Sequence, residues 1–411
     1  MADVNAHAVD DAWSWLASRR RAERRRDPAV ARALLDALAI PDPPSVVHVV
    51  GTNGKGSVAT ARAAMASASG RRSGRFLSPH VERFEERIAV DGVAIAPETV
   101  IAFAARARTL VEAGVEAALH AGFFEWTLAL ALLAFADAGV ELAVIEAGVG
   151  ARHDATLAVG NVIGAVVTNV DLDHVETLGP DLASIARDKA AAVRPGVPVV
   201  TAARGVALGV VRETASRLAA PLLVVTDSEP VSALPDALHA RARRDGWPAT
   251  RIENLRLAFA LGRLLGWPEP ALTAAAADTP PPPARFERFQ LGGVQVVLDG
   301  AHDPAAARRL ALELPSDTVL LFAALARKQG GATLAALAPS VARVVLTSAD
   351  PSEAPGPWPA DARLADPEQA LATALAWAGP GGTVAIAGSL YLAGRLRPVL
   401  LGATAGAGVA G

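Results

Sequence analysis

The sequence of 411 residues contains no cysteine, which excludes disulfide bonds and metal sites built on thiolates. It also lacks an excess of positive charge. The formal net charge is −3 at pH 7, so nucleic acid is not favoured as the main partner. No N-terminal segment resembles a signal peptide, and every apolar run is short or interrupted. We therefore expect a cytoplasmic protein that does not cross or bind a membrane.

What is present is the composition of a globular protein, with 52% hydrophobic and 20% charged residues. A chain of 411 residues exceeds one ordinary hydrophobic core, which predicts two or three domains. The most apolar helical run, residues 126–138, is too short to span a membrane and is expected to be a core helix.

The first 226 residues have a clear order of elements. Residues 8–39 are predicted to form two helices, separated by the basic run 18–26, which is either a solvated surface or a patch for a polyanionic substrate. From residue 46 to about 226, strands and helices alternate, which predicts a parallel sheet with helices on both faces. The core residues expected in the first two helices are Trp13, Leu16, Val30, Leu34, Leu35 and Leu38.

A strand of β-branched residues ends at a glycine turn with one lysine, Gly51-Thr-Asn-Gly-Lys-Gly-Ser57, and a helix is predicted from residue 58 to about 69. A strand, a glycine turn and a helix place backbone N–H groups against a phosphate. Lys55 would bind the outer phosphates, and the Ser57 hydroxyl could reach Mg²⁺. The turn departs from the general pattern G-x-x-x-x-G-K-[ST], because Gly56 separates the lysine from the serine.

Polar residues follow the next buried strands. The strand 142–146 ends on Glu146, which is either a Mg²⁺ ligand beside the glycine turn or a surface carboxylate. A second glycine-rich loop follows at residues 148–156. The strand 162–168 leads directly to Asp171-Leu-Asp-His174. The segment 75–88 has no clean periodicity and is expected to be a functional or surface loop.

Four consecutive prolines, residues 280–283, form the clearest linker. They predict an N-terminal domain at 1–279 and a smaller C-terminal domain at 284–411, with a frayed tail from residue 402. The predicted fold class is α/β: a P-loop-type ATPase domain with a largely parallel sheet, and a smaller Rossmann-like domain. The strands expected in the second domain are 294–298, 319–323, 343–347 and 383–387.

Several motifs, taken in order, resemble the folylpolyglutamate synthase/dihydrofolate synthase family of the Mur ligase superfamily. The glycine turn matches that superfamily's own variant of the phosphate loop. The resemblance runs from about residue 10 to 398. It rests on Leu77-Ser-Pro-His-Val, Phe124-Glu-Trp-Thr127, Glu146-Ala-Gly-Val-Gly-Ala-Arg-His-Asp-Ala-Thr156, Asp173-His174, Ile185-Ala-Arg-Asp-Lys-Ala190, Asp299-Gly-Ala-His302 and Gly388-Ser-Leu-Tyr-Leu392.

The resemblance implies ATP-dependent ligation of L-glutamate to folate or dihydropteroate. The acceptor carboxylate attacks the γ-phosphoryl group, and the glutamate amine then displaces phosphate from the acyl phosphate. It implies two Mg²⁺ sites, with Ser57, Ser78 and Glu146 at the first and Glu146 and His174 at the second. K⁺ is a further candidate ion. From chemistry alone, His174 would be structural or a general base.

The resemblance also assigns Lys189, which the family carries as a carbamate formed with CO₂; an ordinary lysine on a helix surface is the alternative. The catalytic residues would be Lys55, His174 and Lys189. The implied ATP contacts are Thr52, Asn53, Gly54, Lys55, Gly56, Ser57, Asn254, Arg285, Asp299 and His302. The acceptor pocket would be lined by Phe124, Glu125, Asp154 and Ala155, although Phe124 could be a core aromatic. The family is usually monomeric.

Some positions depart from the family pattern. Leu157 and Asp303 both stand where the family has asparagine, and Gln329 stands where it has aspartate. The early pteroate contact is weak, with Arg32 as its remnant. These departures leave open whether the acceptor is dihydropteroate, a folate that already carries glutamate, or both. The alternatives are a Mur-type ligase with another acceptor, which the short segment before residue 46 disfavours, and a non-catalytic nucleotide-binding relative.

Overall fold

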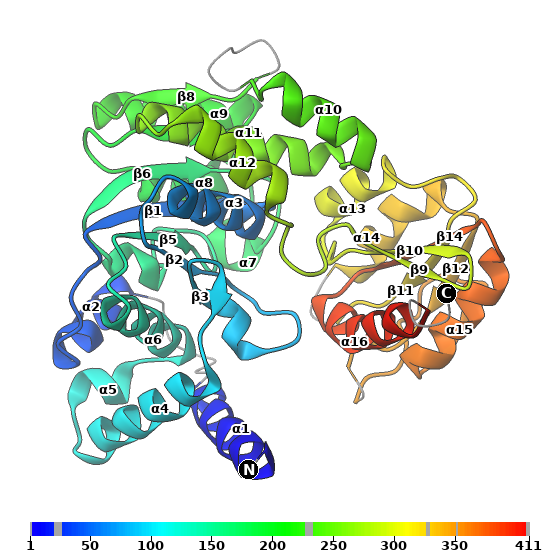
Figure 1. Cartoon of the computed structure of the whole chain (residues 1–411), viewed down its shortest axis with the longest axis horizontal. Coiled ribbons are helices and arrows are strands. Elements are labelled where there is room, and N and C mark those ends of the chain that lie inside the picture. Colours follow the sequence, from blue (N-terminus) through cyan, green and yellow to red (C-terminus); the bar gives the residue numbers. More distant parts are fainter. Residues whose placement is uncertain (1, 20–26, 227–232, 326–328, 351, 408–411) are drawn as a thin grey trace. The chain divides into compact units, whose positions relative to one another are not determined.

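The computed structural model describes residues 2–19, 27–226, 233–325, 329–350 and 352–407. The chain forms two compact units, each with its own sheet and its own hydrophobic core (Figure 1). Unit 1 comprises Met1–Trp247 and Arg251–Pro280, and unit 2 comprises Pro248–Thr250 and Pro281–Gly411. The predicted basic run 18–26 lies outside the described residues except for its first two positions.

The sheet of unit 1 has eight strands in the order β4-β3-β2-β5-β1-β6-β7-β8. The six strands from β2 to β8 are parallel, and β3 and β4 add an antiparallel edge. This confirms the predicted α/β class with a largely parallel sheet. The strands are β1 (Ser45–Val50), β2 (Ser73–Phe76), β3 (Ile88–Val90), β4 (Val93–Ala94), β5 (Leu142–Glu146), β6 (Val162–Val167), β7 (Val199–Thr201) and β8 (Leu222–Val224).

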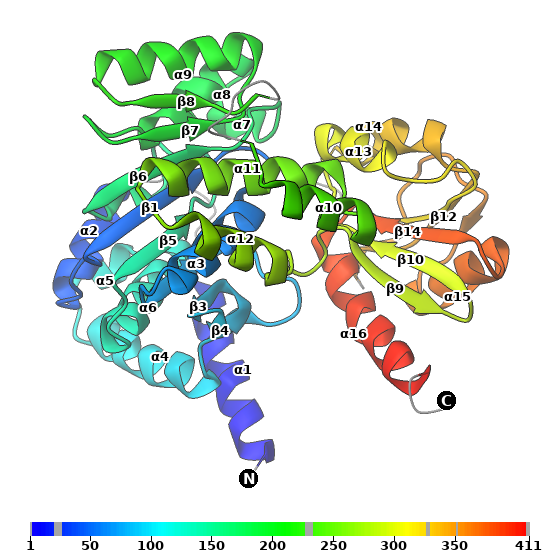
Figure 2. The ribbon, with the colours of Figure 1, turned by 45° about the horizontal axis from the view of Figure 1, so that its top comes forward.

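Helices cover both faces of this sheet, because successive side chains of a strand point to opposite faces. In β1, Val46 packs into the core formed with α1, α2, α4 and α6, whereas Val47 and Val49 pack against α3, α11 and α12 (Figure 2). The helices are α1 (Ala2–Ser18), α2 (Pro28–Ala37), α3 (Lys55–Ala68), α4 (Pro97–Glu112), α5 (Glu116–His120), α6 (Phe123–Asp137), α7 (Val175–Leu178), α8 (Leu182–Lys189), α9 (Gly205–Arg217), α10 (Asp236–Asp245), α11 (Ala249–Leu264) and α12 (Glu269–Asp278), with short 3₁₀ turns η1 (Phe84–Arg87), η2 (Ala155–Ala158) and η3 (Ala190–Ala192).

The sequence of α2 determines both where this helix starts and which of its faces is buried. Asp27 accepts a hydrogen bond from the Ala29 N–H, and Pro28 occupies the first helical position, so both residues favour a helix start at this point. Spacing of three and four residues then places Ala31, Leu34 and Leu35 on one buried face. Leu16 and Leu38 are also buried as predicted, and Trp13 and Val30 pack at the edge of the same core.

Unit 2 is a smaller α/β unit whose six strands follow the order β13-β12-β11-β14-β10-β9. All are parallel except β9, which pairs antiparallel with β10 and was not predicted. The strands are β9 (Glu287–Leu291), β10 (Val294–Leu298), β11 (Val319–Phe322), β12 (Arg343–Leu346), β13 (Ala362–Arg363) and β14 (Thr383–Ala387), and the helices are α13 (Pro304–Ala311), α14 (Gly330–Leu337), η5 (Ala338–Ser340), α15 (Pro367–Ala378) and α16 (Leu390–Ala407).

Two predictions of irregular structure were partly wrong. The segment 75–88 begins inside β2 and ends at the first residue of β3, because Arg75 and Phe76 pair with β5. The chain from residue 402 is helical as far as Ala407, where it continues α16. No helix in the described parts of the chain is long and apolar enough to cross a membrane.

Candidate active site

The glycine turn between β1 and α3 is held by residues that follow the neighbouring strand β6. The Asn53 N–H donates to Asn169 Oδ1 at 2.8 Å, and Thr168 Oγ1 donates to the Asn53 carbonyl at 2.7 Å. Gly54 has a φ of 84°, which favours glycine, and a Cβ at this position would lie 2.3 Å from Asn254 Oδ1. Asn254, on α11, therefore borders the turn.

Lys55 begins α3 and lies between the turn and a carboxylate. Its Nζ donates to the Thr52 carbonyl at 3.1 Å and lies 4.0 Å from Glu146 Oε1. The first N–H groups of a helix have no partner within the helix, so they and the Lys55 ammonium are groups that can bind an anion. α3 begins at Lys55, three residues before the predicted start.

Glu146 is buried at the carboxyl end of β5, so the alternative of a surface carboxylate is wrong. Its Oε2 accepts a hydrogen bond from the Ser78 N–H at 3.0 Å. A Cβ at Gly56 would come within 3.3 Å of the same oxygen. A side chain between the lysine and the serine would therefore crowd this carboxylate, which gives a physical reason for the departure from the general loop pattern.

Three residues of unit 1 offer oxygen ligands that suit a hard cation. Carboxylate and hydroxyl oxygens are ligands that Mg²⁺ prefers, and Ser57, Ser78 and Glu146 supply them from the first turn of α3, from the residues after β2 and from the end of β5. The nearby Lys55 limits the negative charge on this group before a cation binds.

Lys189 lies at the end of α8 with its side chain pointing into unit 1. It is 3% exposed, and its Nζ donates to the Gly51 carbonyl at 2.7 Å, so the alternative of a surface lysine is wrong. Burial and the charge of Lys55 lower the pKa of Lys189 to about 7, although nearby aspartates oppose this shift. A large part of this amine is therefore neutral near pH 7, which is the form that reacts with CO₂.

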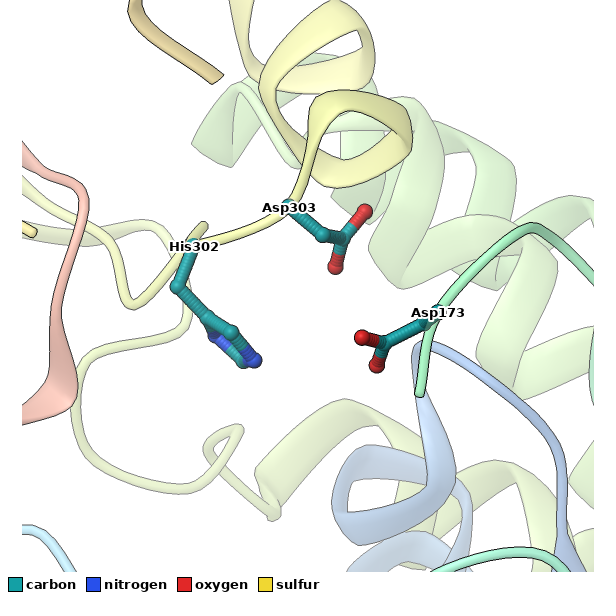
Figure 3. Close-up of side chains that lie close together, drawn as sticks. All are labelled: Asp173, His302 and Asp303. Atoms are coloured by element: carbon teal, nitrogen blue, oxygen red, sulfur yellow. The ribbon is translucent and has the colours of Figure 1, made fainter. Parts of the chain in front are cut away.

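His174 precedes α7 in a left-handed backbone conformation with a φ of 53°. Its ring nitrogen Nε2 lies 3.4 Å from Asp173 Oδ2, and its backbone N–H donates to Asp173 Oδ1 at 2.9 Å. Asp173 itself belongs to the loop after β6 (Figure 3). The imidazole thus has a neighbouring carboxylate that can orient it, as histidines that bind metals commonly do.

The four residues predicted for the acceptor pocket lie in one region of unit 1, but two of their carboxylates are bound to the backbone. Asp154 is buried and accepts hydrogen bonds from the N–H groups of Gly148, Val149 and Thr156. Glu125 accepts from the Gly122 N–H at the start of α6. Phe124 is partly buried with its ring centroid 5.6 Å from that of Phe76. Ala155 begins η2 and is buried.

Three predicted ATP contacts lie in unit 2: Arg285 precedes β9, and Asp299 and His302 follow β10. Asp299 accepts from the N–H groups of Phe286 and Ala301, both at 2.8 Å. Burial raises the pKa of Asp299, whereas the charge of Arg285 and these hydrogen bonds oppose the rise. His302 Nδ1 lies 2.9 Å from the Gly300 carbonyl, and His302 and Asp303 stand at the start of α13 (Figure 3).

The departures from the family pattern have local explanations. Asp303 caps α13 by accepting from the N–H groups of Ala305 and Ala306. Leu157 packs at the edge of a core cluster, and its carbonyl accepts from Arg194 Nη2. Gln329 precedes α14, with its backbone carbonyl bound by Thr333.

Arg32, the remnant of the early contact, forms ion pairs with Asp36 and Asp42. Sequence reasoning missed Thr168 and Asn169, although polar residues directly after a buried strand were a signal for them.

Comparisons with known proteins agree on one family. Residues 284–390 match the Mur ligase, glutamate ligase domain. The chain is 36% identical over 392 residues to a probable bifunctional folylpolyglutamate synthase/dihydropteroate synthase of Haloferax volcanii, covering 86% of this chain and 46% of that protein. It is 30% identical over 394 residues to the folylpolyglutamate synthase of Lacticaseibacillus casei, covering 87% of this chain and 90% of that protein.

The fold has a close counterpart among solved structures. Escherichia coli FolC in complex with DHPP and ADP superposes with a TM-score of 0.79 at 26% identity, covering 95% of this chain and 98% of that chain. The chain spans less than half the length of the first curated relatives that it matches. The likeness to the Lacticaseibacillus casei protein, in contrast, extends over nearly the whole of both chains.

Proposed function

The chain belongs to the folylpolyglutamate synthase family, and on that premise we propose that it ligates L-glutamate to a folate-type carboxylate with cleavage of ATP to ADP and phosphate. The reaction has two steps. A carboxylate oxygen of the acceptor attacks the γ-phosphorus, which forms an acyl phosphate and releases ADP. The glutamate amine then attacks the acyl carbon, loses a proton and displaces phosphate, which leaves an amide.

The observation that carries this proposal is the position of Lys55 between the glycine turn and Glu146. An ammonium group held by the Thr52 carbonyl is placed to neutralise the β- and γ-phosphates at the start of α3. Phosphoryl transfer depends mainly on such alignment and charge neutralisation, because its transition state spreads negative charge over the phosphoryl oxygens. Thr52, Asn53, Gly54, Gly56 and Ser57 are proposed to contact the same phosphates.

Mg²⁺ is the proposed cofactor, with Ser57, Ser78, Glu146 and His174 as the residues that would hold it. When bound, it would neutralise phosphate charge and fix the orientation of the γ-phosphoryl group. The residues of the chain do the remaining work. Ser78 orients Glu146 through its backbone N–H, and Lys189 fixes the Gly51 carbonyl.

Several finer assignments extend the proposal. Lys189 is proposed to react with CO₂, because its buried amine has a pKa of about 7. Asn254, Arg285, Asp299 and His302 are proposed to contact the nucleotide, and Phe124, Glu125, Asp154 and Ala155 to line the acceptor pocket. Since Asp154 and Glu125 already accept backbone hydrogen bonds, we propose that they shape this pocket and that the Phe124 ring supplies its flat apolar surface. K⁺ as a further ion and a monomeric state complete the proposal.

The test is a ligation assay with ATP, Mg²⁺, L-glutamate and either dihydropteroate or tetrahydrofolate. We expect ADP, phosphate and an acceptor that is heavier by one glutamate residue, detected by mass spectrometry. Comparing the two acceptors decides whether the chain starts or extends the glutamate chain, or does both. If ATP turns over but no tested folate gains glutamate, the acceptor assignment is wrong. If ATP is bound without turnover, the chain is a non-catalytic relative.

A further inference from the structure

The segment that connects β2 to β3, residues 77–87, touches the proposed magnesium site through one backbone group. The Ser78 N–H donates to Glu146 Oε2, and this contact sets the direction of a carboxylate that is buried at the end of β5. Ser78 is also a candidate ligand. The conformation of the 77–87 segment therefore determines where two proposed ligands stand.

Glu86 organises this segment from within. Its Oε2 accepts from the Val81 N–H at 2.8 Å, and its Oε1 accepts from the N–H groups of Glu82 and Arg83 at 3.1 and 2.8 Å. Hydrogen bonds to an ionised carboxylate are stronger than those between neutral groups. Three of them on one side chain fix the backbone of the turn that follows Ser78 and His80.

Arg87 closes the same segment from its other end. Its carbonyl accepts from the Leu77 N–H at 2.7 Å, and its Nε donates to His80 Nδ1 at 2.8 Å. Its guanidinium carbon lies 5.3 Å from the ring centroid of Phe123, and the side chain is buried. Such packing adds a cation–π attraction to the hydrogen bonds. Arg87 thus joins the residues on either side of Ser78 to the start of α6.

Arg75 links this segment to the helix that follows the phosphate loop. Its Nη1 donates to Thr60 Oγ1 on α3 at 3.2 Å, and its Nη2 donates to the Glu86 carbonyl at 3.4 Å. The charges of Glu86 and Glu146 both stabilise its cationic form against the effect of burial, which lowers its pKa. The 77–87 segment is therefore tied to α3 as well as to Glu146.

We propose that Glu86 and Arg87 are positioning residues for the magnesium site, which hold the 77–87 segment so that Ser78 and Glu146 are preorganised for the cation. This inference rests on the proposed function only for the identity of the cation. Mg²⁺ demands near-ideal octahedral geometry, so ligands that must first be ordered bind it more weakly. Neither residue needs to touch the cation or ATP for this role.

The test is the affinity for the non-hydrolysable ATP analogue AMPPCP, measured by calorimetry on the whole chain with Mg²⁺ and with EDTA. We expect Arg87→Ala to weaken binding about tenfold with Mg²⁺, as the loss of one charged hydrogen bond implies. Binding with EDTA should change less than about twofold, because the phosphate loop itself is intact. Glu86→Gln keeps the size of the side chain and should act in the same direction, since its amide can no longer accept all three N–H groups.

Arg83→Ala is the matched control, because it removes an exposed arginine from the same segment. It should bind as the wild type does under both conditions. Hydrogen exchange at the Val81 and Glu82 amides supplies a second readout, and it should become faster in both Arg87→Ala and Glu86→Gln but not in the control. A merely structural role would weaken binding equally with and without Mg²⁺.

The inference is overturned if the two variants bind with Mg²⁺ as tightly as Arg83→Ala, or if the loss is the same in EDTA. Neither outcome depends on ligation, so failure of the proposed activity is recognised separately in the wild-type assay. If Arg87→Ala does not fold, Glu86→Gln and its exchange rates decide the question.

Discussion

At the scale of single residues, Lys55 combines two contacts that an outer-phosphate ligand needs. The Thr52 carbonyl holds its ammonium group over the turn, and Glu146 Oε1 lies 4.0 Å away. We expect Lys55→Ala to lower the rate of ligation about 10²- to 10³-fold, the usual loss when one group that stabilises transition-state charge is removed. The measurement is kcat from ADP release with a folate acceptor and L-glutamate.

The thermal midpoint of Lys55→Ala is the control for this loss, and it should stay close to that of the wild type, since Lys55 is the first residue of α3 and its side chain does not belong to the core. Lys55→Arg separates charge from shape and should recover only part of the activity, because a planar guanidinium does not replace a compact ammonium. Unchanged ligation in Lys55→Ala would show that the phosphate loop is not used for catalysis.

The buried Lys189 amine makes the free energy of unfolding rise with pH. Its pKa in the folded chain is about 7, below the ordinary value of 10.5. Between these values the unfolded chain binds more protons, so the free energy of unfolding rises with pH. In buffers free of CO₂, we expect the wild type to gain up to about 1.4 kcal/mol per pH unit over this range relative to Lys189→Met.

Urea unfolding of both proteins from pH 6 to 10 measures that difference. Below pH 7 the two curves should run parallel, because Lys189 is then charged in both the folded and the unfolded chain. Parallel curves over the whole range would mean that the buried amine keeps its ordinary pKa. Adding bicarbonate at pH 8 tests the proposed carbamate, which would be detected by ¹³C NMR of labelled bicarbonate.

At the scale of elements, the N-cap of α13 explains why aspartate is tolerated at position 303, where the family has asparagine. Asp303 Oδ1 accepts from two N–H groups in the first turn of α13. Asparagine, which the family has at this position, caps helices equally well. We expect Asp303→Asn to change the free energy of unfolding by less than about 0.5 kcal/mol and Asp303→Ala to lower it by about 1 kcal/mol.

Chemical denaturation measures both variants, and Asp27→Ala is the control, because Asp27 also caps a helix, α2, although it is exposed and accepts from one N–H group only. A similar loss in Asp303→Ala and Asp27→Ala would identify capping as the cause. A loss in Asp303→Asn as large as that in Asp303→Ala would instead assign the effect to the negative charge.

Elements with a strong local pattern could be predicted from the sequence, and those set by partners could not. Leu142–Glu146 is an uninterrupted apolar run that ends on a carboxylate, and β5 has those bounds. β9 carries the polar residues Arg288 and Gln290 on its exposed positions, and it is part of the sheet through its pairing with β10. Residues 402–407 contain two glycines and a threonine, which weaken a helical pattern, yet α16 continues through them.

In the candidate site, too, residues with a local sequence pattern could be predicted, and residues that act through a distant partner could not. The glycine turn and Glu146 could be found because their residue types and spacing carry the chemistry, whereas Lys189 was assigned through the family resemblance. Their supports could not, because the Asn169 amide on the Asn53 N–H and the Glu86 carboxylate on three amides are contacts between residues with ordinary side chains. Hydrogen bonds of this kind become visible only after the strands bring the residues together.

At the scale of the whole molecule, the two units have separate cores, which predicts that each can lose stability without the other. In unit 2, Arg397 on α16 forms a bidentate ion pair with Glu287 on β9, with its closest contact at 2.7 Å. Both side chains are largely buried, so this pair is worth more than one at an exposed surface. We expect Arg397→Met to destabilise unit 2 by about 1 kcal/mol.

Hydrogen exchange resolved by peptide measures the two units at once. Arg397→Met should speed exchange in β10 and β14 and leave β1 and β5 unchanged. Arg263→Met is the reciprocal control, because Arg263 forms an ion pair with Glu269 in unit 1 at 3.0 Å; the Glu269 side chain is 51% exposed, so a smaller effect is expected. It should speed exchange in the unit 1 strands alone. If either variant speeds exchange in both units equally, the chain unfolds as one cooperative body, and binding of Mg²⁺ and nucleotide to one unit must then stabilise the other by the same free energy.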